Sequence, residues 1–233
     1  MYLNPECPWV VWHKYSLCSN GVEYFNENFQ NLLKKYKNFL SISITVDGTQ
    51  EMHDKCRIFH NGTGSYDLAM KAALHNLKNN NIKSTKITLS NENLHNAFDA
   101  VKHMLENGFI EININCIFED VWDNSIHPKI LYYEIKKMAD YVVQNDLIDK
   151  CFIRFLDPYA YNDYNKDAED SFCGASRAML SLDPKGDIFP CIRFMESSLG
   201  KDNEPLKIGD IKFGIGATEL DLSNLKTISS VTN

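Results

Sequence analysis

Residues 39–57 read FLSISITVDGTQEMHDKCR, and this stretch decides the fold. Its first half is rich in apolar and β-branched residues, which predicts a strand over residues 39–46. Asp47 and Gly48 follow directly and predict a turn at the end of that strand. The same order of strand, turn and amphipathic helix repeats between about residues 14 and 145. Repeated units of this kind predict a parallel sheet or barrel, so we expect an α/β fold.

The other strands and helices of this region follow from the same alternation. Short apolar runs predict strands at residues 15–19, 39–46, 84–89 and 110–118. Apolar residues spaced three and four apart predict a helix after each strand, at about residues 29–36, 65–77, 91–107 and 128–142. Ser65 is a good N-cap for the second of these helices.

The strand expected at residues 110–118 differs from the others, because apolar and polar residues alternate along it. Ile112 and Ile114 alternate with Glu111, Asn113 and Asn115. A parallel strand that is buried on both faces is expected to be apolar almost throughout. The amides therefore indicate a wet barrel interior that could hold a ligand. The alternative is an edge strand with one solvated face.

Polar side chains also follow the ends of two predicted strands. In a parallel αβ barrel, the carboxyl ends of the strands build the active site. Thr45 offers a hydroxyl there and Asp47 a charge, and Arg57 could hold a carboxylate through two hydrogen bonds. Ser19 and Asn20 end the preceding strand in the same way. The alternatives are that Asp47 only caps the turn, that Arg57 lies on the surface, and that residues 19–21 form a simple turn.

A second module is expected after about residue 150, where the pattern changes. Two short apolar runs, Ala178–Leu182 and Ile188–Ile192, flank DPKG at residues 183–186, which predicts a hairpin. Cys173 and Cys191 bracket this hairpin, so their sulfurs could lie close together as metal or cluster ligands. The alternative is that both are structural thiols. We therefore expect two domains, residues 1–147 and residues 148–233.

Composition excludes several classes of protein. The net charge is −7 with acids and bases mixed along the chain, so we expect no nucleic-acid partner. No apolar run approaches the roughly 20 residues that cross a bilayer, and no signal-peptide pattern is present, so we expect a cytoplasmic protein without membrane contact. The chain has seven cysteines, an odd number spread widely, which argues against a disulfide framework.

Taken together, four motifs resemble those of radical SAM enzymes with a SPASM domain, particularly maturases of ribosomally made peptides. Ser19-Asn20-Gly21 resembles the S/T-N-G that ends the third barrel strand in that family. Residues 43–57 resemble its S-I-D-G-x-x-E-x-H-D-x-x-R signature, and NGTGSYD at residues 61–67 resembles G-x-G-S-[FY]-D. Cys173, Gly186 and Cys191 resemble the opening half of the SPASM pattern, and IFPC at residues 188–191 resembles its ending. The four motifs occur in the family's order over almost the whole chain.

The resemblance implies a fold, a reaction and a set of site residues. The fold would be a partial radical SAM (β/α)6 TIM-like barrel, units three to six, followed by the start of a SPASM module. Thr45 would contact the ribose of S-adenosylmethionine (AdoMet), and Arg57 its methionine carboxylate. The residues expected to bind the cofactor are Ser19, Asn20, Thr45, Asp47, Arg57 and Asn115. Cys173 and Cys191 would ligate an auxiliary 4Fe-4S cluster.

The implied activity is a radical SAM enzyme that modifies a peptide, or a related sulfatase-maturase-like activity. A 5'-deoxyadenosyl radical would abstract hydrogen from a peptide substrate, and a small reductant protein is a further possible partner. The family's C-x3-C-x2-C, its Gly-Gly-Glu and its later SPASM cysteines are absent from this sequence. We therefore expect an internal fragment that is inactive alone. The alternative is a non-catalytic peptide-binding or regulatory remnant of the same fold.

Overall fold

The computed structural model describes residues 15–117, 121–157, 180–196 and 204–216, except for the side chains of residues 15 and 16. The chain divides into two compact units, Met1–Tyr161 and Asn162–Asn233, and each is described by itself. The last strand of the first sheet, Phe152–Ile153, belongs to the first unit.

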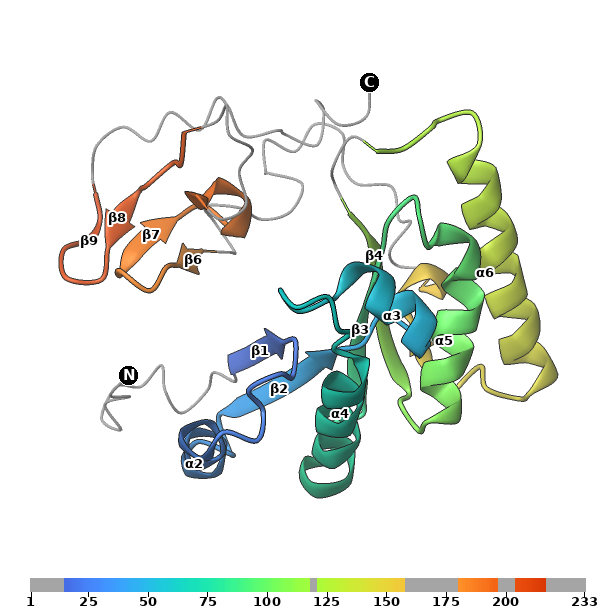
Figure 1. Cartoon of the computed structure of the whole chain (residues 1–233), viewed down its shortest axis with the longest axis horizontal. Coiled ribbons are helices and arrows are strands. Elements are labelled where there is room, and N and C mark those ends of the chain that lie inside the picture. The colour runs from blue at the N-terminus through green and yellow to red at the C-terminus, as the bar shows by residue number, and fades with distance from the viewer. Residues whose placement is uncertain (1–14, 118–120, 158–179, 197–203, 217–233) are drawn as a thin grey trace. The chain divides into compact units, whose positions relative to one another are not determined.

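The first unit contains a parallel sheet of five strands (Figure 1). The strands follow one another in chain order: β1 (Tyr15–Ser19), β2 (Leu40–Thr45), β3 (Ser84–Leu89), β4 (Glu111–Cys116) and β5 (Phe152–Ile153). Every neighbouring pair in this sheet is parallel. The predicted parallel α/β fold is confirmed. Among the described residues the sheet is open, since β1 pairs with β2 alone and β5 with β4 alone.

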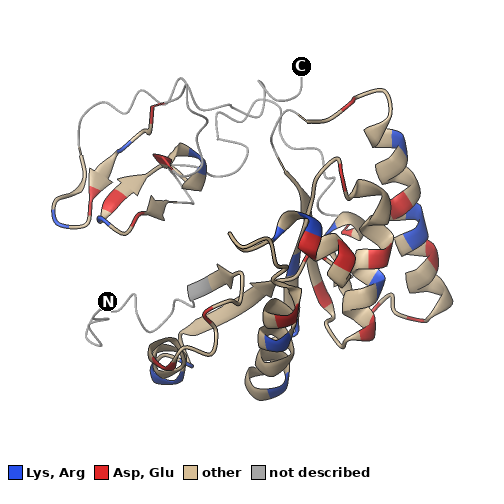
Figure 2. Cartoon of the chain, viewed as in Figure 1, with Lys and Arg blue, Asp and Glu red and all other residues tan. Residues whose placement is uncertain are grey.

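Helices connect these strands and cover one face of the sheet. They are α2 (Glu27–Lys35), α3 (Gln50–Cys56), α4 (Tyr66–Asn80), α5 (Ala97–Glu106) and α6 (His127–Gln144), with a 3-10 turn η1 (Leu94–Asn96) before α5 and another, η2 (Arg154–Leu156), after β5. Pro128 lies in the first turn of α6, where its missing N–H costs nothing. The short helix α3 was not predicted from the sequence. Acidic and basic residues alternate along α6 (Figure 2), where Lys136 pairs with Asp140.

The hydrophobic core lies between the sheet and the helices. α4 packs against β2, and α5 packs against β3 and α6. Ile44, Ile87 and Ile114, at the centres of three neighbouring strands, are at most 1% exposed. Burial of such a side chain stabilises the fold by roughly 1.5–3 kcal/mol relative to exposure. These positions fix which face of each strand is turned away from the core.

The opposite face of the sheet is polar across three strands. It presents alternate residues of each strand: Ser41, Ser43 and Thr45 from β2, Ser84, Lys86 and Thr88 from β3, and Glu111, Asn113 and Asn115 from β4. The register aligns Lys86 with Asn113 and Thr88 with Asn115, so the polar residues form continuous rows. We call this surface the polar sheet face. The edge-strand alternative for β4 is wrong, because β4 pairs with both β3 and β5.

The second unit contains a small antiparallel sheet in the order β6 (Ser181–Leu182), β7 (Asp187–Phe189), β8 (Gly209–Asp210) and β9 (Gly214–Ile215). β6 and β7 form the predicted hairpin. Its turn is closed by Asp183, whose Oδ1 accepts hydrogen bonds from the N–H groups of Lys185 and Asp187, both at 2.9 Å. Gly186 adopts φ +92°, which favours glycine. In the described parts of both units, no helix has the length and apolar character needed to span a bilayer.

Candidate functional site

Asp47 is the centre of a hydrogen-bonded cluster at the carboxyl ends of β2 and β3. Its carboxylate is buried, with the residue 2% exposed. Oδ1 accepts a hydrogen bond of 2.8 Å from the N–H of Thr88, in β3, and Oδ2 accepts one from Nε of Arg57. Asp47 therefore does more than cap its own turn, because it connects β2 to β3 and holds Arg57.

Arg57 lies directly after α3 and is the C-cap of that helix. Its side chain is 30% exposed, so the guanidinium is neither free in solvent nor enclosed. The Nε–H is used by Asp47, while neither Nη group has a hydrogen-bond partner among the described residues. An arginine guanidinium presents its donors in a fixed planar fork that matches a carboxylate. Arg57 can therefore bind an anionic group through both Nη atoms while it stays anchored.

His53 is fully buried in α3, and its ring forms hydrogen bonds with the segments before and after that helix. Nδ1 accepts a hydrogen bond of 3.1 Å from the N–H of Asp47, and Nε2 lies 3.1 Å from Oγ of Ser65. Burial lowers the pKa of His53 below its ordinary value, which favours the neutral ring. Because Nδ1 accepts a hydrogen bond, the proton of the neutral ring lies on Nε2, and Nε2–H donates a hydrogen bond to Oγ of Ser65. The Ser65 hydroxyl in turn donates a hydrogen bond of 2.8 Å to the carbonyl oxygen of Arg57. This geometry supports a structural role for His53.

Two glycines allow close packing of the segment between the end of β2 and the start of α4. Gly48 adopts φ +90°, and a Cβ atom there would lie 2.5 Å from Cβ of Ala100, in α5. At Gly64, a Cβ atom would lie 2.0 Å from Cγ of Asp54. The carboxylate of Asp54 accepts a hydrogen bond of 2.9 Å from the N–H of Tyr66, the first residue of α4. The backbone from the end of β2 to the start of α4 is thus held at several points.

The structure places the other expected cofactor-binding residues at the same edge of the sheet. Thr45 is the last residue of β2 and is 6% exposed. Asn115 is half-buried in β4, in register with Thr88. The side chains of Ser19 and Asn20 accept hydrogen bonds of 3.1 Å from the N–H groups two residues ahead, Gly21 and Val22. These two bonds fit the simple-turn alternative for residues 19–21.

Three polar residues of this edge were not identified from the sequence. Lys86 is half-buried on the polar sheet face, in register with both Thr45 and Asn113. Thr88 supplies the N–H that Asp47 binds. Oγ of Ser90, just after β3, is buried without a hydrogen-bond partner in the described part of the chain. The alternation of STKITLS at residues 84–90 is a signal that could have indicated them.

The expected metal ligands lie in the second unit. Cys191 is 4% exposed and precedes the short turn η4 (Ile192–Phe194) as a free thiol. Cys173 lies outside the described residues. Within the described ranges, no group of three His, Cys, Asp or Glu side chains could hold a metal ion. Whether the two sulfurs lie together stays a prediction.

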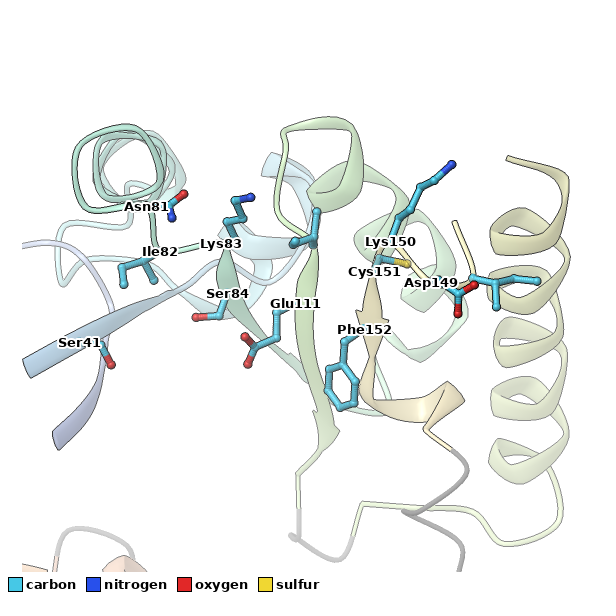
Figure 3. A pocket seen from close by; sticks show the side chains of 12 residues that line it. Ser41, Asn81, Ile82, Lys83, Ser84, Glu111, Asp149, Lys150, Cys151 and Phe152 are labelled. Atoms are coloured by element: carbon cyan, nitrogen blue, oxygen red, sulfur yellow. The ribbon is translucent and has the colours of Figure 1, made fainter. Parts of the chain in front are cut away.

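A hollow lies at the end of the sheet opposite to the Asp47 cluster. It has a volume of about 980 Å³ and is lined by the first residues of three strands, Ser84, Glu111 and Phe152 (Figure 3). Its lining also includes Lys83, Asp149 and Lys150, so charges of both signs are present. This end is built from the amino ends of the strands, whereas sites in parallel barrels form at the carboxyl ends. We therefore take the cluster around Asp47 and Arg57 as the candidate site.

The comparisons with known proteins bear on the fold that carries this site. No family model matches the chain, and no curated protein matches it. Among solved structures, native anSMEcpe with bound AdoMet matches with a TM-score of 0.59 at 16% identity, over 94% of this chain and 58% of that chain. A histidine-tagged form of anSMEcpe with bound AdoMet matches with a TM-score of 0.61 at 16% identity, over 84% and 51%.

A third structure, native anSMEcpe with bound AdoMet and Kp18Cys peptide, matches with a TM-score of 0.59 at 14% identity, over 94% and 59%. anSMEcpe is an anaerobic sulfatase-maturating enzyme of the radical SAM SPASM class. At these identities the likeness establishes the fold, which this chain shares with part of that enzyme. The chain spans less than two thirds of the length of the solved proteins that it matches.

Proposed function

We propose that this chain is part of a radical SAM enzyme that modifies a peptide, and that it binds AdoMet at the carboxyl ends of β2 and β3. The single observation that supports this most is the state of Arg57. Its guanidinium is fixed through Nε by a buried carboxylate, and neither Nη group has a partner in the described part of the chain, so both are available as a carboxylate-binding arginine requires. The fold shared with anSMEcpe and the motifs at residues 43–57 and 61–67 support the same proposal.

The residues of the site have distinct roles in this proposal. Arg57 binds the methionine carboxylate, and Thr45 contacts the ribose. Asn20 follows the end of the neighbouring strand β1 and would approach the same ligand, and Asn115 lies on the polar sheet face, where a peptide could hydrogen-bond to rows of amides and hydroxyls. The unpartnered hydroxyl of Ser90 fits a polar ligand at this edge, because a buried hydroxyl without a partner is costly. AdoMet bound here would be the source of the radical that abstracts hydrogen, and the electron for its reductive cleavage would come from a reduced cluster whose C-x3-C-x2-C motif is absent from this sequence.

An iron-sulfur cluster stays a proposal at Cys173 and Cys191. Cys173 lies outside the described residues, so the cluster rests on the resemblance alone and we assign no step to it. A peptide substrate, a reductant protein and a cytoplasmic location are proposed on the resemblance. The solved complexes of anSMEcpe with peptides support the peptide partner.

The proposal is tested by AdoMet binding to the chain, measured by isothermal titration calorimetry. Arg57→Ala removes a charge-assisted bidentate contact worth about 1.5–3 kcal/mol, which corresponds to a loss of affinity of roughly 10- to 100-fold. Lys55→Ala is the matched control, because it removes a cation from an exposed position of the same helix, where Lys55 pairs only with exposed Glu51 among the described residues. The control is expected to bind like the wild type.

The same titration separates the alternative function. A folded wild-type chain that does not bind AdoMet would favour the non-catalytic remnant, which keeps the sheet but not the cofactor. Equal binding by Arg57→Ala and the wild type would contradict the assignment of the site to Arg57.

A further inference from the structure

We propose that Asp47 and His53 are positioning residues for Arg57, and that Asp47 itself does not touch the ligand. This inference rests on the proposed function, in which the ligand presents a carboxylate to Arg57. It changes the expected role of Asp47 from a cofactor contact to a support for one.

Both oxygens of Asp47 are already used. Oδ1 accepts from the N–H of Thr88 and Oδ2 accepts from Nε of Arg57, and the side chain is 3% exposed. Because the Asp47 side chain is 3% exposed, a ligand could reach its remaining acceptor sites only if the surrounding residues moved. The carboxylate is fixed on one side by the sheet, so it holds the guanidinium at a defined place relative to the end of β3.

The contact is made through Nε, which determines the direction of the remaining donors. A guanidinium is planar, so an acceptor at Nε restricts its rotation and orients the two Nη groups. Pre-organisation of this kind lowers the entropy lost when a ligand binds, because the side chain is already ordered. A lysine ammonium also has three N–H donors, but they rotate about a single nitrogen, so an acceptor on one of them would not orient a planar fork toward a carboxylate.

His53 fixes the backbone that carries Arg57. Its ring accepts from the N–H of Asp47 and, through Ser65, its other nitrogen is connected to the carbonyl of Arg57. Residues 47 and 57 are thereby joined twice, once by their side chains and once through the buried histidine. The burial of His53 and the lowered pKa of its ring are consistent with a permanent neutral connection.

The test uses Asp47→Asn, which has nearly the shape of the aspartate. The asparagine oxygen can still accept from the N–H of Thr88, but its amide then presents a donor to Nε of Arg57 and the anchor is lost. Glu51→Gln is the matched control, since it makes the same chemical change on α3 at a side chain that is 84% exposed. Ser65→Ala tests the histidine connection, because His53→Ala would open a cavity and could unfold the chain.

The readout compares AdoMet with decarboxylated AdoMet, which lacks the group that Arg57 is proposed to bind. For Asp47→Asn, we expect about tenfold weaker binding of AdoMet and unchanged binding of decarboxylated AdoMet, and for Ser65→Ala a smaller loss with the same selectivity. Glu51→Gln should bind both ligands like the wild type. Asp47→Asn that binds AdoMet normally, or that loses both ligands equally, would overturn the inference, because the second result indicates general damage to the site.

Failure of the proposed function would look different. In that case the wild type would bind neither ligand, and the position of Arg57 can still be followed by NMR through its Nε–H signal, assigned with Arg57→Lys. We expect that signal to move in Asp47→Asn and to stay in Glu51→Gln. An unchanged signal in Asp47→Asn would overturn the positioning role whatever the ligand.

Discussion

Gly48→Ala should destabilise the first unit far more than Gly62→Ala, although both glycines have similar φ angles. Gly48 has φ +90° and Gly62 has φ +83°. An alanine in this left-handed region costs about 1–2 kcal/mol at either position, and a less flexible unfolded chain returns about 0.4–1 kcal/mol. The two positions differ in space, since a Cβ at Gly48 would lie 2.5 Å from that of Ala100, whereas nothing lies within 4 Å at Gly62.

The extra contact sets the size of the difference. Such overpacking costs typically about 1–3 kcal/mol, so we expect a loss in the free energy of unfolding of about 2–4 kcal/mol for Gly48→Ala and about 1 kcal/mol or less for Gly62→Ala. Urea denaturation followed by circular dichroism at 222 nm measures both values. Equal losses at the two glycines would refute the reasoning, because they would show that the turn after β2 is not packed against α5 as described.

Two further predictions concern buried polar groups. The pKa of His53 is lowered from its ordinary value of 6.5, so on acidification the unfolded chain takes up a proton that the folded chain does not. The free energy of unfolding is therefore unaffected by this group above about pH 6.5 and falls below it, by at most about 1.4 kcal/mol per pH unit. Urea midpoints at pH 5.5 and 7.5 should therefore differ more for the wild type than for His53→Gln, and an equal difference would contradict the buried neutral ring. Glu134 of α6 accepts a hydrogen bond of 2.8 Å from the N–H of Phe98, at the start of α5, so Glu134→Ala should cost about 1–3 kcal/mol. Lys137 pairs with Glu134 but has a side chain that is 55% exposed, so Lys137→Ala should lower the free energy of unfolding by less than about 1 kcal/mol in the same titration. A larger loss would show that the ion pair contributes more than the hydrogen bond between Glu134 and the N–H of Phe98.

The parallel sheet could be predicted from the sequence because four of its strands, each of five or six residues, alternate with amphipathic helices along the chain. β5 could not, since Phe152–Ile153 is a strand of two residues that pairs with the start of β4. The helix α3 has seven residues, of which only Met52 and His53 are buried, so it lacks the apolar stripe that identifies a helix. Tertiary contacts with neighbouring elements stabilise such short elements, and their own sequences carry no periodic signal that would predict them.

The candidate site was predictable in part. Thr45, Asp47 and Arg57 lie in one short segment that the sequence motif covers. The partner of Asp47 on β3 was not predictable, because Thr88 is 41 residues away and meets Asp47 only through the register of β2 and β3. Ser65 was recognised as a helix N-cap, but its hydroxyl forms no capping bond and binds the carbonyl of Arg57 instead. Tertiary contacts decided both outcomes.

The two bonds of Asp47 have a consequence for how this site can diverge. The bond to Thr88 connects Asp47 to β3, and the bond to Arg57 orients the guanidinium for the proposed ligand. A descendant that stopped using the ligand could not simply replace Arg57, because the buried carboxylate of Asp47 would lose its cationic partner, and the N–H of Thr88 in β3 would still need an acceptor. Among diverged copies of this gene, positions 47 and 57 should therefore change together, and a copy with a neutral acceptor such as asparagine at position 47 and no arginine at position 57 marks a lineage that kept the sheet and no longer binds the ligand.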